Sequence, residues 1–404
     1  MKNSRGFSLV ELMIAIVLGL LVTDAMVAMF VSVRSASRTT EGVAGLSDSG
    51  RYALDTVEQV VRGAGNLACN STAPVSAAGV TLARVLNNLG AGASPLISNY
   101  DQPLSGYEAT GSAPGATLTV YGDPAAQPTP GAGDWLSTAA LGGSLDEVLV
   151  APPVPSGQVA PTGTPIAGSD MLVVHETLPG VRPGYALADA TGATSFPISS
   201  SGTTFTGADQ IAAISNCAQA EVFQLGGFNA ATGTVDLTGA SGPGNLGGSL
   251  APGLLFPIGA QVDPVDVTVF YVGIGADGDG ALFKYDGNGG VLGSALATNQ
   301  ELVPDVENMQ ILYGVEDAAS STTQSAAQYV TADQVAAKSF TGDFNGVISV
   351  KIALLVASPP GAVPKGAAVA AGPSLLGTNW TLSAADNRIR KVYEQTMFLR
   401  NMSP

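Results

Sequence analysis

Charged residues, histidine and cysteine are scarce in this sequence. Asp, Glu, Lys and Arg make up 12% of the 404 residues, against about 25% in an average soluble protein. The 16 Lys and Arg residues are outnumbered by 32 Asp and Glu residues. This balance argues against nucleic acid as a partner, because phosphate binding needs clustered basic side chains. One histidine and two cysteines exclude most zinc and iron–sulfur sites.

The sequence also lacks a catalytic constellation. A site of the His–Ser–Asp or His–Cys type would have to use His175 alone, and no second histidine exists to complete a ligand set. We therefore expect a structural or surface histidine. No G-x-x-x-x-G-K phosphate loop occurs. The sequence predicts neither an enzyme nor a cofactor.

Glycine and proline, by contrast, are abundant, with 51 and 25 residues. Glycine alone is nearly double its usual ~7% share. The hydrophobic fraction of 46% is sufficient for a folded core. Together these values indicate an acidic, loop-rich β protein of the cell exterior.

The N-terminus joins a short basic stretch to a long apolar one. MKNSRG carries Lys2 and Arg5, and the apolar character runs from Leu12 to Val33 with an interruption at Thr23 and Asp24. A secretory signal peptide would need a small-residue cleavage site, which is missing, and would not hold Glu11 in its apolar stretch. A plain membrane anchor is long enough, but each central carboxylate would cost about 2.5–3.5 kcal/mol on insertion scales.

The segment RGFSLVELMIAIVLGLLV resembles the class III signal of type IV pilins and type II secretion pseudopilins. The resemblance implies cleavage after Gly6 by prepilin peptidase and methylation of the new Phe7 amine. It also implies that Glu11 neutralises the Phe7 amine of a neighbouring subunit, so that the charges are paired within the apolar filament core. A glutamate that snorkels to the lipid headgroups is the alternative for Glu11. The absence of proline before residue 74 and the additional Asp24 favour a specialised subunit over the bulk pilin.

The helix is expected to continue well beyond the apolar stretch. Leu54, Val57, Val60 and Val61 follow helical spacing, and the glycines at 63 and 65 are stop signals. Gly42, Gly45 and Gly50 allow either one continuous helix or a break between Gly42 and Gly50. The predicted organisation is a leader at 1–6, a transmembrane or filament-core helix at 7–31, an amphipathic continuation at 32–65, and a β-rich periplasmic or extracellular domain at 66–404.

Beyond the helix the pattern is that of strands separated by turn residues. The fold class is predicted as α+β and pilin-like, with the helix packed on an antiparallel β domain that carries long Gly/Ser/Ala-rich loops. Three stretches are predicted as such loops or insertions: 71–116, 122–145 and 226–265. A short helix is expected at 332–338. Predicted strands are 117–121, 147–151, 170–175, 220–225, 267–272, 281–285, 309–313 and 347–356.

Several blocks of the chain resemble the PilW family of minor pilins: SDMLVVH, ISNCAQAEVFQL, ELVPDVENMQILYGVED, QYVTADQV, GVISVKIALLVASP and NRIRKVYEQTMFLRN. The resemblance implies a subunit that primes or supports type IV pilus assembly at or near the tip. Implied partners are other minor pilins, the major pilin, prepilin peptidase, the inner-membrane assembly machinery and a tip adhesin. Implied locations are the inner membrane, with the C-terminal domain in the periplasm, and then the pilus surface. Alternatives are a J-type minor pseudopilin of type II secretion and a tip adhesin.

Three groups of residues remain as candidate sites. Cys69 and Cys217 are expected to form a disulfide, because a translocated domain is oxidised and because PilW-like chains carry a cysteine at both places; two buried thiols are the alternative. The loop ADGDGALFKYDGNGG offers Asp277, Asp279 and Asp286 as weak calcium ligands, although two turns flanking a strand explain it as well. A basic cluster near the C-terminus is predicted to be a solvated face, or alternatively a contact with an acidic pilin: Arg388, Arg390, Lys391 and Arg400.

Overall fold

The structure is a computed structural model, and it describes most of the chain. The described residues are 8–71, 75–77, 80–82, 85–90, 99–100, 102–121, 134–136, 162–178, 180–199, 205, 207–240, 244–287, 298–316, 325–339, 341–363, 372, 374–382 and 386–402. The predicted strand 147–151 lies outside them.

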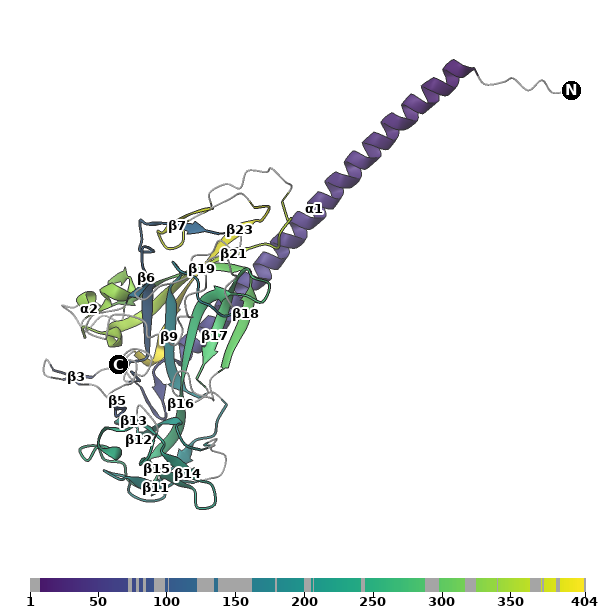
Figure 1. Ribbon diagram of the computed structural model, residues 1–404. Helices are drawn as coiled ribbons and strands as arrows, with labels where there is room; N and C mark the ends of the chain where they lie inside the picture. The colour runs from purple at the N-terminus through teal and green to yellow at the C-terminus, as the bar shows by residue number, and fades with distance from the viewer. Residues whose placement is uncertain are drawn as a thin grey trace.

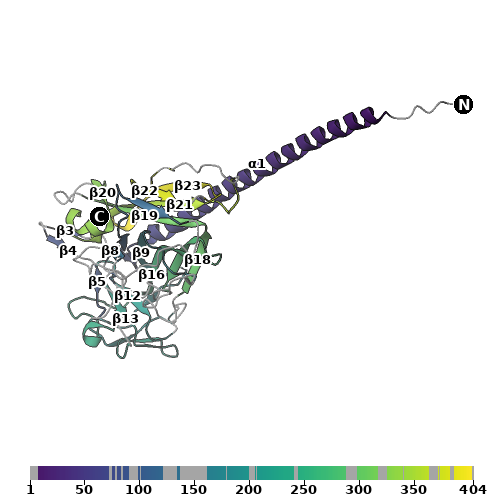
Figure 2. The same cartoon turned by 45° about the horizontal axis from the view of Figure 1, so that its top comes forward.

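One long helix, α1 (Leu9–Gly63), projects from a β-rich domain (Figures 1 and 2). Its 55 residues extend about 80 Å at 1.5 Å per residue. The helix has no break at Gly42–Gly50, and it ends at Gly63 as its glycines predict. Its N-terminal part is exposed. From Gly42 onward one side is buried in the domain, at Gly42, Leu46, Gly50, Ala53, Leu54, Val57 and Val61.

The domain is built on a ten-stranded sheet. The strands follow the order β5-β13-β12-β16-β9-β6-β8, with β10, β17 and β18 attached beside β16 and β17. Neighbouring strands are antiparallel except for the parallel pair β5 and β13. The bounds are β5 (Val85–Asn87), β6 (Leu104–Ala109), β8 (Trp135–Leu136), β9 (Met171–Thr177), β10 (Gly184–Tyr185), β12 (Ile211–Ser215), β13 (Ala220–Gln224), β16 (Gln261–Ile274), β17 (Gly280–Asp286) and β18 (Thr298–Pro304).

A second, four-stranded antiparallel sheet lies against the helix. Its order is β20-β19-β21-β23, and β21 and β23 run beside α1 in both views (Figures 1 and 2). The main hydrophobic core joins this sheet, the ten-stranded sheet and the buried side of α1. The bounds are β19 (Val306–Val315), β20 (Gln328–Val330), β21 (Val347–Ala357) and β23 (Arg390–Phe398).

A small lobe with its own core lies at the end of the domain away from the N-terminus (Figure 1). The lobe holds a three-stranded sheet of β11 (Ser195–Pro197), β15 (Thr234–Asp236) and β14 (Gly227–Asn229). The long strand β16 connects it to the body, since its first half pairs with β10 and β12 and its second half with β9 and β17.

The remaining elements are short. They are β1 (Asn66–Leu67), β2 (Asn70–Ser71), β3 (Val75–Ala77), β4 (Val80–Leu82), β7 (Thr117–Val120), β22 (Asn379–Leu382), η3 (Leu246–Gly248), η4 (Ala332–Gln334), α2 (Val335–Lys338), η5 (Phe344–Gly346) and η6 (Arg400–Met402). Strands β7 and β22 form a second parallel pair.

The described strands that the sequence predicts are present, and α+β is the observed class. The predicted helix at 332–338 is η4 followed by α2. All three predicted loop stretches are wrong in part. Stretch 71–116 contains β6, a fully buried strand of the central sheet, and stretch 122–145 contains β8 of the same sheet. Stretch 226–265 contains β14, β15 and the start of β16. Strand β6 reads LSGYEA and is buried on both faces, so it shows no alternation that would distinguish it from a loop.

Two helix glycines allow α1 to lie close against the β domain. A Cβ built on Gly50 would come within 2.5 Å of the Tyr393 ring on β23, and one on Gly42 within 2.9 Å of the Ala362 Cβ. Gly45, on the exposed side, has no atom within 4 Å of such a Cβ. Gly42 and Gly50 are therefore packing positions that are buried against the domain, and they do not break the helix.

We predict that Gly50→Ala destabilises the protein by about 1–3 kcal/mol, because the methyl group must displace a packed ring. Gly45→Ala is the matched control, and it should stabilise by up to about 1 kcal/mol through helix propensity. Urea unfolding of the full chain, followed by the fluorescence of the buried Trp135 and Trp380, measures both. Equal effects of the two substitutions would contradict close packing at Gly50.

Candidate assembly interface

The N-terminal half of α1 is an apolar stretch of helix that is not buried against any other described part of the chain. Its side chains are strongly exposed from Leu9 to Val33, with Leu9 at 74% and Phe30 at 65%. It is the only described helix that is long and apolar enough to cross a membrane, and none of that apolar window is buried. An exposed apolar surface of this length is stable only in lipid or against other helices.

Two carboxylates interrupt this apolar surface. Glu11 lies in the first turn of α1 and is exposed, and Asp24 lies about three and a half turns further on. In an apolar medium a carboxylate needs a cation or hydrogen-bond donors. Gly6 and Phe7 lie outside the described residues, so a pairing of Glu11 with the Phe7 amine stays a prediction.

At its other end α1 is held by polar contacts as well as by packing. Thr39 Oγ1 donates to the Ala362 carbonyl at 2.8 Å, and Gln395 Nε2 donates to Glu58 Oε2 at 2.6 Å. Asn401 Nδ2 donates to the Ala64 carbonyl just past the helix end, at 2.9 Å. These contacts lie along the whole buried half of the helix. The buried half of the helix is therefore fixed to the β domain by hydrogen bonds as well as by apolar packing.

The predicted solvated basic face is wrong for two of its four members. The Arg390 side chain is 1% exposed, and its guanidinium binds both carboxylate oxygens of Glu307, at 2.6 and 2.7 Å. It also donates to Asp386 at 2.7 Å. Buried arginines are paired because an unpaired charge is costly in a low dielectric. Only Lys391 and Arg400 are exposed.

Two of the three calcium candidates lie together, and the third, Asp286, does not. Asp277 and Asp279 lie with Asp305, all three offering oxygens within 4.8 Å of one another. Asp286 is elsewhere, paired with Lys284 at 2.6 Å. The cation beside this cluster belongs to the chain, since Arg388 contacts Asp279 and also lies 3.2 Å from Asp305. A guanidinium thus supplies the positive charge that a calcium ion would bring.

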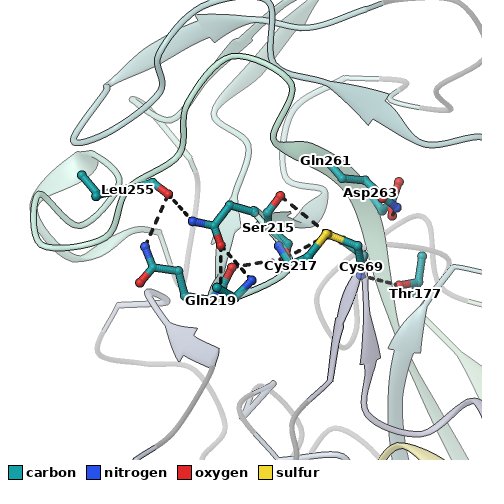
Figure 3. The surroundings of a disulfide bond; sticks show 11 residues. Cys69, Thr177, Ser215, Cys217, Gln219, Leu255, Gln261 and Asp263 are labelled. Carbon is teal, nitrogen blue, oxygen red and sulfur yellow. Dashed lines mark hydrogen bonds between the residues drawn. A yellow bond between two sulfur atoms is a disulfide. The ribbon is translucent and has the colours of Figure 1, made fainter.

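Cys69 and Cys217 are joined by a disulfide with a Cα–Cα distance of 4.9 Å (Figure 3). Cys69 follows the end of α1, and Cys217 lies in the turn between β12 and β13. Around it, Ser215 Oγ accepts from the Cys217 amide at 3.0 Å, and Thr177 Oγ1 accepts from the amide of Ala68. The bond ties the helix end to the strands that lead into the lobe.

We predict that the double substitution Cys69→Ser/Cys217→Ser lowers the unfolding free energy by about 2–4 kcal/mol, because the bond closes a long loop. The bond spans 148 residues. Urea unfolding under oxidising conditions measures the loss, and wild type unfolded in reductant should match the double variant. A wild type insensitive to reductant would contradict a stabilising bond.

Two buried carboxyl groups lie close together, that of Glu108 on β6 and that of Asp170 directly before β9. Asp170 accepts hydrogen bonds from the amides of Ala109 and Ile311, each at 2.8 Å, and from Ser112 Oγ at 3.1 Å. Glu108 lies 3.2 Å from the same Ser112 hydroxyl. Burial, with the nearby Asp170 charge as the second cause, raises the pKa of Glu108. Two backbone amides donate to Asp170 and stabilise its charged form. Glu108 is therefore the carboxyl of the pair that holds the proton.

We predict that Glu108→Gln makes the protein more stable than wild type at pH 8, by on the order of 2 kcal/mol, with little difference at pH 5. The folded pKa of Glu108 lies above its unfolded value, so the folded state binds the extra proton and loses stability as pH rises. Urea unfolding at both pH values measures this. Glu394→Gln, at an exposed position of β23, is the control and should keep the wild-type pH dependence.

His175 is structural, as predicted. It is fully buried in β9, its Nδ1 lies 3.0 Å from the Gln102 carbonyl, and its ring packs on Tyr100 at a centroid distance of 4.7 Å. No local pattern in the sequence indicates the Glu108–Asp170 pair or the contact of Tyr393 with Gly50. The i,i+4 spacing of Asp386 and Arg390 is a pattern typical of an ion pair.

Models of known families match two parts of the chain, one at each end. A model of the prokaryotic N-terminal methylation motif matches residues 1–23, and a model described as type IV pilus-assembly protein W, PilW, matches residues 269–401. The two matches cover less than half of the chain, and they show that it is similar to type IV pilin-like proteins of the PilW family. The PilW segment runs from the second half of β16 to the C-terminal strand, so it includes the sheet that holds α1. The methylation motif includes Gly6, Phe7 and Glu11.

Other comparisons add less. A type IV-like pilin from Thermus thermophilus aligns with 50% of this chain and 86% of its own, at 19% identity and a TM-score of 0.20. That score is too low to compare the two folds in detail. No curated protein sequence matches the chain. The lobe and all residues from 24 to 268 lie outside both family matches.

Proposed function

We propose that this chain is a minor pilin of the PilW family that primes or supports type IV pilus assembly. The observation that carries the proposal is the exposed apolar half of α1, with Glu11 in its first turn, on a helix whose other half packs against the PilW segment. Before assembly this half lies in the inner membrane and the β domain lies in the periplasm. Cleavage after Gly6 and methylation of Phe7 prepare the N-terminus.

In the assembled pilus, the apolar side chains of α1 pack against the helices of neighbouring pilins. Glu11 pairs with the Phe7 amine of a neighbour and fixes the axial position of the subunit, because both charges are costly in an apolar core unless they meet. The role is structural, and no catalytic step is part of it. Other minor pilins, the major pilin and the inner-membrane assembly machinery are the partners.

A position at or near the tip follows from size. The β domain extends from residue 66 to the end of the chain and projects widely from one helix (Figure 1). Such a domain would collide with its copies if repeated at every step of a filament, whereas a subunit at the tip has none above it. Immunogold labelling tests this: we expect label at pilus ends, and regular label along the shafts would contradict it.

A deletion strain tests the function itself. We expect few or no pili in the sheared surface fraction, with secretion of a type II substrate unchanged. Re-expression of the wild-type chain should restore the pili. Normal pili with lost secretion would instead identify a pseudopilin. Normal pili and normal secretion would contradict a priming role.

A further inference from the structure

A groove lies where α1 leaves the β domain, next to the apolar half of the helix. It has a volume of about 1350 Å³ and is lined by α1 and, across from it, by Gly361, Val363 and Asn387. On the helix side it is apolar at Phe30 and Val31 and basic at Arg34 and Arg38. The groove therefore changes from apolar to cationic within two turns of helix.

The two arginines are available for an external anion. Among the described residues neither forms an ion pair, and both are exposed. The nearest helix carboxylate, Glu41, accepts from Ser37 Oγ at 3.1 Å, and Asp386, next to Asn387, is taken by Arg390. The sequence that follows Val363 contains Lys365 and no acidic residue before Asp386.

The groove lies at the depth of lipid headgroups when α1 spans a membrane. The apolar stretch Leu9–Val33 is about 37 Å long at 1.5 Å per residue, and a tilted helix of that length matches a hydrocarbon core of about 30 Å. Arg34 is the next residue. Helix side chains lean toward the N-terminus, so both guanidinium groups point back to the bilayer surface.

We propose that Arg34 and Arg38 bind the phosphate of an anionic phospholipid in this groove, with its acyl chains along Phe30 and Val31. The site rests on the membrane-anchored stage of the proposed function. Arginine suits it because its guanidinium donates two parallel hydrogen bonds to a phosphate. The lipid would orient the subunit in the membrane before it enters a pilus, and it would leave when neighbouring helices take its place.

Lipid retention by the full chain tests the site. The chain is reconstituted in phosphatidylcholine nanodiscs that contain a minor fraction of phosphatidylglycerol, and native mass spectrometry counts the lipids that remain bound after transfer to detergent. We expect selective retention of phosphatidylglycerol. The double variant Arg34→Gln/Arg38→Gln should lower that selectivity by roughly tenfold, since each basic residue near an anionic surface contributes to binding.

Arg51→Gln is the matched control, because Arg51 is exposed on the same helix but outside the groove, and it should retain wild-type selectivity. Equal retention of both lipids by wild type, or an equal loss with Arg51→Gln, would overturn the proposal. Displacement of the lipid by inorganic phosphate at constant ionic strength would overturn it in favour of a free-anion site.

A double variant that keeps lipid selectivity but no longer enters pili would overturn it in favour of an acidic neighbouring pilin. Lipid retention is measured on the isolated chain, without any pilus. It can therefore contradict the lipid site while the deletion strain still loses its pili, so the two proposals are tested separately.

Discussion

Glu11→Gln should reduce surface pili by roughly tenfold or more relative to wild type, when the variant is the only copy of the chain in the cell. The substitution keeps the size and the apolar surroundings of the side chain and removes the charge that would meet the Phe7 amine of a neighbour. A buried amine without a counter-ion is costly, so the subunit should fail to lock into the growing filament. Pili counted in the sheared fraction measure the effect.

Two controls keep this result specific. Asp48→Asn removes one carboxylate from an exposed position of α1 outside the apolar half, and it should leave pili unchanged. Immunoblotting of the membrane fraction should show the Glu11→Gln chain at its normal level and normally shortened, because the proposed cleavage after Gly6 would precede assembly. If cells with the Glu11→Gln chain carried as many pili as wild type, charge pairing by Glu11 would not be part of assembly.

Arg390→Met should destabilise the β domain by about 3–5 kcal/mol, because it leaves the buried Glu307 carboxylate without its partner. Glu307 is 4% exposed at its side chain and receives two hydrogen bonds from the guanidinium. The methionine fills much of the arginine volume, so the loss reports charge and hydrogen bonding more than a cavity. Urea unfolding followed by Trp135 and Trp380 fluorescence measures it.

The neighbouring residue on the same strand is the matched control. Lys391 is exposed and contacts the Tyr393 ring, with its Nζ 4.7 Å from the ring centroid, so Lys391→Met should change stability by no more than about 1 kcal/mol. Similar losses for the two variants would contradict a buried ion pair.

The pH dependence of Arg390→Met gives an independent check. Burial already raises the pKa of Glu307 in spite of Arg390, and loss of the arginine should raise it further. An acid whose folded pKa exceeds its unfolded value binds its proton in the folded state. The destabilisation should therefore shrink as pH falls and the carboxyl becomes neutral. A loss independent of pH would point to packing alone.

The N-terminal helix could be predicted from local sequence. An uninterrupted run without proline, a long apolar stretch and apolar residues at helical spacing define α1, because helix formation depends on neighbours three and four residues apart. Strands such as β19 and β21 were predicted for a similar reason, since each is a dense run of β-branched and apolar residues. Strand β6, with Gly106 and Glu108 inside it, lacks that pattern.

The sequence by itself determined the apolar helix, the position of Glu11, the resemblance to pilins and the α+β class, because each is encoded in a contiguous stretch of residues. Only the tertiary structure decided that Arg388 and Arg390 are buried against acids distant in the chain, that Gly50 is a packing position, and that Glu108 meets Asp170. Burial and charge pairing depend on which strands the fold brings together. The same holds for the groove at Arg34 and Arg38, whose second wall comes from more than 300 residues further along the chain.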